Sequence, residues 1–152
     1  MISDSSAPPA GNPSGRHAQG FHPELPVLQA APNCRILVVD DDLDYLHSLA
    51  ALLRDKGHEV WFAINGYAAL EAASHFHPQL VLLDMGLPDM DGCEVARRLK
   101  RLAAFVAPIV AVTARSSEAD RQRSFAAGCV GHLVKPVDPK VMEKIAAYAA
   151  SD

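Results

Sequence analysis

Short apolar runs alternate with helical patterns from Arg35 to the end of the chain. The apolar runs predict strands at 35–40, 58–62, 79–84, 108–113 and 131–134. The stretches between and after them predict helices at 43–56, 65–76, 91–102, 117–127 and 138–149. In the first helix, apolar residues recur at the i, i+3, i+4, i+7 spacing that is typical of one buried face, at Leu46, Leu49, Ala50 and Leu53.

The regular alternation of strand and helix predicts one parallel sheet. The runs at 35–40, 79–84 and 108–113 are largely apolar, as strands are when helices cover both faces of a sheet. Crossover connections between parallel strands are right-handed, which limits the arrangement of the helices. We therefore expect an α/β fold, a three-layer α/β/α sandwich around a five-stranded parallel sheet.

Residues 1–33 have no such periodicity. They contain six prolines and three glycines, and they cannot bury enough apolar surface to offset the entropy of ordering the chain. We expect them to be a disordered N-terminal extension or linker, followed by one folded domain at 34–152.

Composition and charge narrow the class of protein. The chain is 49% hydrophobic and 21% charged, as in ordinary globular proteins, and its net charge of -4 disfavours direct binding to nucleic acid. No apolar stretch approaches the length of about 18 to 20 residues that a membrane helix needs. The N-terminal residues also lack a secretory signal pattern, so we expect a cytoplasmic location. Its three cysteines are widely spaced and are expected to be reduced.

Polar side chains follow four of the predicted strands. Asp40 and Asp41 follow the first apolar run, Asp84 ends the third, Thr113 ends the fourth, and Lys135 follows the fifth. In an open parallel sheet the carboxyl ends of the strands lie along one edge, where such folds bind ligands. We therefore expect three acids, a hydroxyl and a lysine to converge on one small site.

These residues stand in four motifs that together resemble the receiver domain of two-component response regulators, the CheY-like family. The motifs are Asp40-Asp41, the segment from Asp84 to Asp89 (sequence DMGLPD), Thr113-Ala114 and Lys135-Pro136. They occur in the order of the family, within residues 35–150. The resemblance implies the strand order 2-1-3-4-5 and a cis peptide bond before Pro136.

The resemblance also implies a role for each site residue. Asp84 would accept a phosphoryl group from a phosphohistidine, while Lys135 and Thr113 would contact its oxygens. Three carboxylates and one main-chain carbonyl would bind Mg²⁺, with Mn²⁺ as an alternative, through Asp40, Asp41, Asp84 and Gly86. The domain would catalyse its own phosphorylation and dephosphorylation, and would not otherwise be an enzyme.

His132 departs from the family pattern, which has Tyr or Phe three residues before the lysine. That aromatic residue swings inward when the threonine is drawn to the phosphoryl group, so Thr113 and His132 are the expected switch residues. The alternative is that His132 is only an exposed strand side chain. Gly86 and Arg115 lie where family members influence the access of hydrolytic water, and Arg115 could reach over the small Gly86.

The resemblance implies two kinds of partner. A histidine kinase or a histidine phosphotransfer protein would donate the phosphoryl group. Phosphorylation adds charge at Asp84, and we expect it to change the face formed by 117–127, 131–134 and 138–149. A downstream protein, or a second copy in a phosphorylation-dependent homodimer, would bind this face.

Three alternatives stand beside this interpretation. A haloacid-dehalogenase-like phosphohydrolase needs a second Asp two residues after its nucleophile, and Gly86 occupies that position. A pseudo-receiver would bind a partner without being phosphorylated, and only His132 supports it. The chain could also be a receiver excised from a hybrid histidine kinase, with residues 1–33 as an interdomain linker.

Overall fold

The computed structural model describes residues 34–150, which form alternating strands and helices. The strands are β1 (Arg35–Val39), β2 (Glu59–Ala63), β3 (Leu80–Leu83), β4 (Ile109–Thr113) and β5 (Gly131–Val134). The helices are α1 (Leu43–Asp55), α2 (Gly66–Phe76), α3 (Gly92–Arg101), α4 (Glu118–Ala126) and α5 (Pro139–Ala150). Each predicted boundary lies within one residue of these bounds. The expected disorder of residues 1–33 lies outside the described residues.

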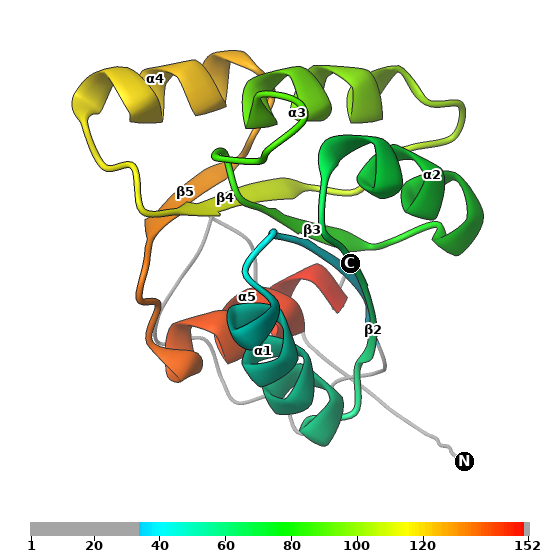
Figure 1. Ribbon diagram of the computed structural model, residues 1–152. Coiled ribbons are helices and arrows are strands. Elements are labelled where there is room, and N and C mark those ends of the chain that lie inside the picture. Colours follow the sequence, from blue (N-terminus) through cyan, green and yellow to red (C-terminus); the bar gives the residue numbers. More distant parts are fainter. Residues whose placement is uncertain (1–33, 151–152) are drawn as a thin grey trace. The chain divides into compact units, whose positions relative to one another are not determined.

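The sheet is parallel throughout, with the strand order β2-β1-β3-β4-β5. Helices α2, α3 and α4 cover one face of the sheet, and α1 and α5 cover the other (Figure 1). The predicted three-layer sandwich and its strand order are therefore confirmed. Since β1 lies between β2 and β3, the chain changes its winding direction there, and the carboxyl ends of β1 and β3 lie side by side.

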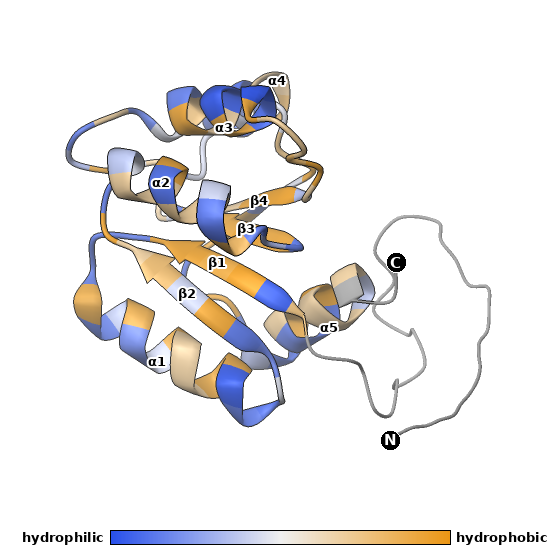
Figure 2. Cartoon of the chain, turned by 90° about the vertical axis from the view of Figure 1, so that its right-hand side faces the viewer, coloured by the Kyte–Doolittle hydropathy of each residue, from blue (hydrophilic) through white to orange (hydrophobic). Residues whose placement is uncertain are grey.

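The core consists of two apolar layers, one on each face of the sheet. Alternate side chains of a strand point to opposite faces. In β1, Leu37 and Val39 join the cluster under α2 and α3, whereas Ile36 and Val38 join the cluster under α1 and α5. In Figure 2, β1 and β4 are accordingly mostly orange, whereas β2, at the edge of the sheet, is mixed. Each fully buried side chain of this size contributes about 1.5 to 3 kcal/mol, which makes the sheet a rigid base for the residues at its edge.

Local side chains fix the helix ends next to that edge. The Asp42 carboxylate accepts a hydrogen bond of 3.2 Å from the Tyr45 N–H and so caps α1. The Asp91 carboxylate likewise accepts the Cys93 N–H at 2.7 Å and caps α3. At the opposite end of the sheet, Gly57 follows α1 with a φ of 96°, a left-handed conformation that glycine adopts readily.

None of the helices between residues 34 and 150 has the length and apolar character required to cross a membrane. The longest of them, α1, has 13 residues.

Candidate functional site

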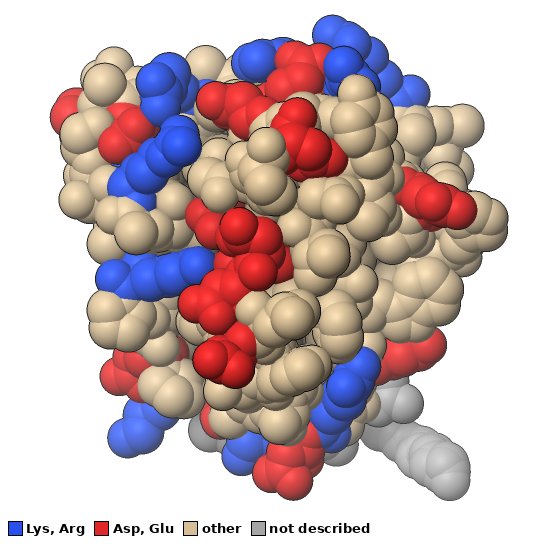
Figure 3. All heavy atoms as spheres, in the orientation of Figure 1, with Lys and Arg blue, Asp and Glu red and all other residues tan. Residues whose placement is uncertain are grey.

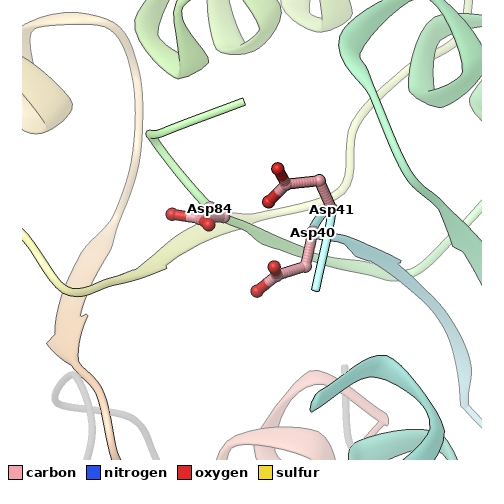
Figure 4. Close-up of side chains that lie close together, drawn as sticks. All are labelled: Asp40, Asp41 and Asp84. Atoms are coloured by element: carbon pink, nitrogen blue, oxygen red, sulfur yellow. The ribbon is translucent and has the colours of Figure 1, made fainter. Parts of the chain in front are cut away.

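Three carboxylates meet at the carboxyl edge of the sheet. Asp40 and Asp41 directly follow β1, and Asp84 directly follows β3. One oxygen atom of each lies within 4.8 Å of the others, and Figure 4 shows the three side chains close together at the ends of these neighbouring strands. Asp40 is 2% exposed and Asp84 is 9% exposed, while Asp41 is open to solvent. Like charges this close destabilise one another, so the cluster favours a bound cation.

Main-chain hydrogen bonds set the orientation of the two buried carboxylates. Asp40 accepts the N–H of Asp42 at 2.9 Å, and Asp84 accepts the N–H of Gly86 at 3.1 Å. The Asp84 N–H donates to the Val39 carbonyl at 2.9 Å, which joins the two strand ends. The acidic side chains therefore occupy fixed positions on the rigid sheet.

The ammonium group of Lys135 lies beside these carboxylates. Its Nζ is 2.5 Å from Oδ2 of Asp40 and 3.5 Å from Oδ2 of Asp84. Lys135 follows β5, and the peptide bond to Pro136 is cis, as the resemblance implies. In the space-filling view, acidic side chains gather near the middle of the face, with basic side chains along their left border (Figure 3).

The close contacts change the proton affinities of both partners. Burial raises the pKa of Asp40, although the hydrogen bonds from Lys135 and Asp42 act in the opposite direction. For Lys135, burial alone would lower the pKa, but the hydrogen bond to Asp40 and the charge of Asp84 raise it above the usual value. The ammonium group therefore stays charged at neutral pH. It offsets only one of the three carboxylates.

Thr113 ends β4 and is buried. Its Oγ1 accepts the N–H of Arg115 at 3.3 Å, so the hydroxyl group holds the loop that leads to α4. The Arg115 guanidinium lies over Gly86, since a Cβ atom at Gly86 would be 3.6 Å from Nη2 of Arg115. The expectation that Arg115 reaches over Gly86 agrees with this placement.

His132 is buried, with 6% of its surface exposed, so the alternative of an exposed strand side chain is wrong. Its Nε2 lies 2.9 Å from the Arg115 carbonyl, and its Nδ1 lies 2.7 Å from Oγ of Ser124. Because a carbonyl only accepts, Nε2 carries a proton and donates it to Arg115. His132 therefore connects α4, which contains Ser124, to the loop after Thr113. The sequence does not reveal this connection, because nothing around Ser124 marks it as a partner of His132.

Sequence reasoning missed two residues that shape the site. Tyr45, in the first turn of α1, places its ring centroid 4.4 Å from Nζ of Lys135. Asp89 accepts the N–H groups of Gly66 and Tyr67, at 2.8 and 3.1 Å, and so ties the loop after Asp84 to the start of α2. These backbone hydrogen bonds lower the pKa of Asp89. Neither contact has a local sequence signal, because Tyr45 meets Lys135, and Asp89 meets the start of α2, only in the folded chain.

The site thus combines a cluster of oxygen ligands with a fixed ammonium group. Mg²⁺ prefers carboxylate, carbonyl and water oxygens, and it needs only a few protein ligands. Three carboxylates with a single ammonium leave excess negative charge, which fits a divalent cation. The structure brings together Asp40, Asp41, Asp84, Gly86 and Lys135. Thr113, at the end of β4, and His132, in β5, both hold the loop that leads to α4 through hydrogen bonds with the Arg115 backbone.

Comparison with known proteins identifies the family. Residues 36–147 match the response regulator receiver domain. Over 102 residues the chain is 42% identical to the transcriptional regulatory protein PrrA of Mycobacterium tuberculosis, a match that covers 67% of this chain and 43% of PrrA. The chain therefore matches less than half the length of PrrA. It is also 38% identical over 113 residues to an uncharacterized 14.6 kDa protein of Leptolyngbya boryana, covering 74% of this chain and 86% of that protein.

A solved structure gives the same result. The receiver domain of a sensor histidine kinase from Pseudomonas aeruginosa is 26% identical, with a TM-score of 0.73. The likeness covers 79% of this chain and 99% of that domain, whose crystal structure has a magnesium ion coordinated in the active site cleft. With its parallel sheet, its acidic edge and these matches, the chain belongs to the response regulator receiver domain family of two-component signalling systems.

Proposed function

We propose that Asp84 accepts a phosphoryl group from a phosphohistidine of a histidine kinase or a histidine phosphotransfer protein. The observation that carries this proposal is the position of Lys135, whose ammonium group lies between Asp40 and Asp84. A structural ion pair would need one carboxylate, whereas here one lysine contacts two members of a cluster of three carboxylates. The arrangement suits an anionic group that arrives at Asp84.

In the proposed reaction, a carboxylate oxygen of Asp84 attacks phosphorus and forms an acyl phosphate. The phosphorus–nitrogen bond of the donor breaks, its electron pair stays on the histidine nitrogen, and that nitrogen takes up a proton on the donor side. Catalysis of phosphoryl transfer depends mainly on positioning and on neutralising charge. Asp84 supplies the positioned nucleophile, and Lys135 supplies a positive charge to the phosphoryl oxygens.

Asp40, Asp41 and Asp84, with the main-chain carbonyl of Gly86, would hold Mg²⁺, and Mn²⁺ is the alternative. When bound, the cation supplies further positive charge to the phosphoryl oxygens. The magnesium ion in the receiver domain from Pseudomonas aeruginosa supports this assignment. Thr113 would donate its hydroxyl proton to a phosphoryl oxygen once it leaves the Arg115 N–H.

The switch would start at Thr113 and pass to α4 through His132. Movement of the Thr113 hydroxyl toward the phosphoryl group removes one of the hydrogen bonds that hold Arg115. The carbonyl of the same residue binds His132, which also binds Ser124 on α4. We infer that phosphorylation changes the face of α4, β5 and α5, and that a downstream protein or a second copy binds there. The cytoplasm, where a phosphohistidine donor is available, is the proposed location.

Intact-protein mass spectrometry tests the phosphoryl acceptor. The protein is incubated with acetyl phosphate and Mg²⁺, beside Asp84→Asn and, as a matched control, Asp44→Asn. The expected result is one phosphoryl adduct that needs Mg²⁺, is absent in Asp84→Asn and persists in Asp44→Asn. A folded protein that acquires no adduct from acetyl phosphate or from phosphohistidine donors would instead be a pseudo-receiver.

Hydrogen exchange tests the switch. After phosphorylation, amide exchange is expected to change in the loop from Ala114 to Ser117, in α4 and in β5, and to stay constant in α2. Asp84→Asn treated in the same way provides the reference. An exchange pattern that is identical with and without the phosphoryl group would contradict the proposed route through His132.

A further inference from the structure

The ring of Tyr45 forms one side of the space that holds the Lys135 ammonium. Nζ of Lys135 lies 4.4 Å from the ring centroid, 2.5 Å from Oδ2 of Asp40 and 3.5 Å from Oδ2 of Asp84. A cation within about 6 Å of an aromatic centroid is attracted to the ring face. Lys135 therefore has an aromatic contact in addition to its two carboxylate contacts.

Tyr45 is itself held in place by the acidic edge. Its N–H donates to the Asp42 carboxylate at 3.2 Å, and the Asp42 N–H donates to the Asp40 carboxylate at 2.9 Å. The Tyr45 side chain also packs against the apolar cluster under α1 and α5. The ring is therefore held in place by the backbone and the core, whereas the Lys135 ammonium stands at the end of an intrinsically flexible stem and depends on its contacts for its position.

We propose that Tyr45 is a positioning residue that holds the Lys135 ammonium beside Asp84 while the ammonium changes its anionic partner. The proposal deepens the function proposed above and rests on it. Lysine has a flexible stem with many accessible rotamers, so its ammonium must be restrained to act at one point. In the observed state the shorter contact is with Asp40, and the phosphoryl group would arrive at Asp84.

A ring face suits this task better than a third carboxylate. Attraction between a cation and a ring extends over the face, so the ammonium can shift from Asp40 toward a phosphoryl oxygen and keep the contact. The ring adds no negative charge that would repel an incoming phosphoryl group. The Lys135 ammonium loses part of its hydration when it is buried. Attraction to the Tyr45 ring offsets part of this loss, both when the ammonium contacts Asp40 and when it contacts a phosphoryl oxygen.

The first test measures the rate of phosphorylation by acetyl phosphate in Mg²⁺. Tyr45→Phe keeps the ring and is expected to react at close to the original rate. Tyr45→Leu keeps an apolar side chain without a ring, and its rate is expected to fall about tenfold, as for loss of one partly desolvated cation–π contact. Tyr67→Leu is the matched control, because it removes a cation–π contact with a different cation, Arg98, 5.9 Å from the ring centroid, and keeps the backbone N–H that Asp89 accepts. A rate in Tyr45→Leu equal to that of Tyr67→Leu would overturn the proposal.

A double-variant cycle separates positioning from a structural effect. If Tyr45 acts through Lys135, adding Tyr45→Leu to Lys135→Met leaves the already reduced rate unchanged, because the two effects are not additive. A further tenfold loss in the double variant would overturn the proposal. Urea unfolding of each variant establishes that the compared proteins are folded.

A spectroscopic signature tests the contact without metal or phosphoryl donor. Protons of the Lys135 ε-methylene group, next to the ring face, are expected to show an upfield ring-current shift in the NMR spectrum of the unphosphorylated protein. Tyr45→Phe is expected to keep this shift and Tyr45→Leu to lose it. Ordinary chemical shifts in the original protein would overturn the Tyr45 proposal. The two proposals can fail separately. If the ring-current shift is present but Asp84 accepts no phosphoryl group, the proposed function is wrong, whereas the contact between Tyr45 and Lys135 is established.

Discussion

Burial of the Asp40 carboxylate has a free-energy cost, even though Asp40 forms an ion pair with Lys135. Burial raises its pKa from the usual 3.8, and this effect outweighs the hydrogen bonds from Lys135 and Asp42. A carboxyl group with a raised pKa binds its proton more tightly in the folded state. The stability that it contributes is therefore present at low pH and is lost as the pH rises from about 3.8 through the raised folded value. At neutral pH without a cation, the fold therefore lacks the stability that protonated Asp40 would contribute, although the raised pKa of Lys135 shows that the ammonium gains from the same contact.

Asp40→Asn is therefore expected to raise the melting temperature by a few degrees in the presence of a chelator. The amide oxygen still accepts the Asp42 N–H, and Lys135 keeps Asp84 as a partner. Millimolar Mg²⁺ is expected to stabilise the original protein and to have much less effect on the variant, because a ligand stabilises only the state that binds it. Differential scanning calorimetry, with Asp44→Asn as a control outside the cluster, measures both effects. Equal Mg²⁺ shifts in the two proteins would count against Asp40 as a ligand.

At the scale of elements, the connection from β3 to α3 depends on close packing at Gly92. A Cβ atom on Gly92 would lie 2.4 Å from Cα of Met85 and 2.9 Å from the Asp84 carbonyl oxygen. The Gly92 N–H also donates to the Met85 carbonyl at 3.1 Å. The start of α3 thus packs directly on the backbone that carries Asp84, the proposed phosphoryl acceptor.

Gly92→Ala is expected to reduce the free energy of unfolding by about 1 to 3 kcal/mol, the usual cost of overpacking. The sign is opposite to the stabilisation that alanine normally gives in a helix, because backbone atoms block the new methyl group. Phosphorylation of Asp84 should slow as well. Gly131→Ala is the matched control, since its Cβ atom would meet only Val110 side-chain atoms, the nearest at 3.5 Å. Urea denaturation measures the free energy of unfolding of both variants. If Gly92→Ala is as stable as Gly131→Ala, the packing argument is wrong.

The helices and strands could be predicted from the sequence because each has a local signal. The apolar run from Leu80 to Leu83 is bounded by polar residues, and α1 is followed by Gly57, a residue type that commonly ends helices with a positive φ. Asp84 could be placed because it directly follows such a run. The contacts of Tyr45, Asp89 and His132 could not be predicted, because each is made between different elements that meet only in the folded chain. The Tyr45 ring meets Lys135, 90 positions further along the chain, only after β1 and β5 take their places in the sheet.

At the scale of the whole molecule, stability depends on His58 at the opposite end of the sheet. His58 is buried, and its Nδ1 accepts the Cys34 N–H at 3.2 Å, just before β1 begins. Burial lowers the pKa of His58 below its usual 6.5. The folded state therefore binds this proton more weakly than the unfolded state. The contribution of His58 to stability is complete above about pH 6.5 and decreases as the pH falls toward the lowered folded value.

His58→Asn is expected to reduce the loss of stability between about pH 7.5 and pH 5.5, since asparagine does not titrate in this range. Its amide oxygen can take the place of Nδ1 as the acceptor for the Cys34 N–H. The free energy of unfolding, measured at both pH values, should therefore change less in the variant than in the original protein. An identical change in both would show that other groups cause the pH dependence. His75→Asn, at an exposed position on α2, is the control.

The two hydrogen bonds of His132 have a consequence for how a signal is encoded. Both nitrogen atoms belong to one rigid ring, so a rotation about the Cα–Cβ bond that releases the Arg115 carbonyl also moves the nitrogen that faces Ser124. Rotation of the ring therefore breaks both hydrogen bonds together, and intermediate orientations of the ring have neither bond. Partial phosphorylation of many molecules would then produce a mixture of two discrete conformations and no graded average. The strength of a stimulus would then correspond to the fraction of molecules that adopt the second conformation.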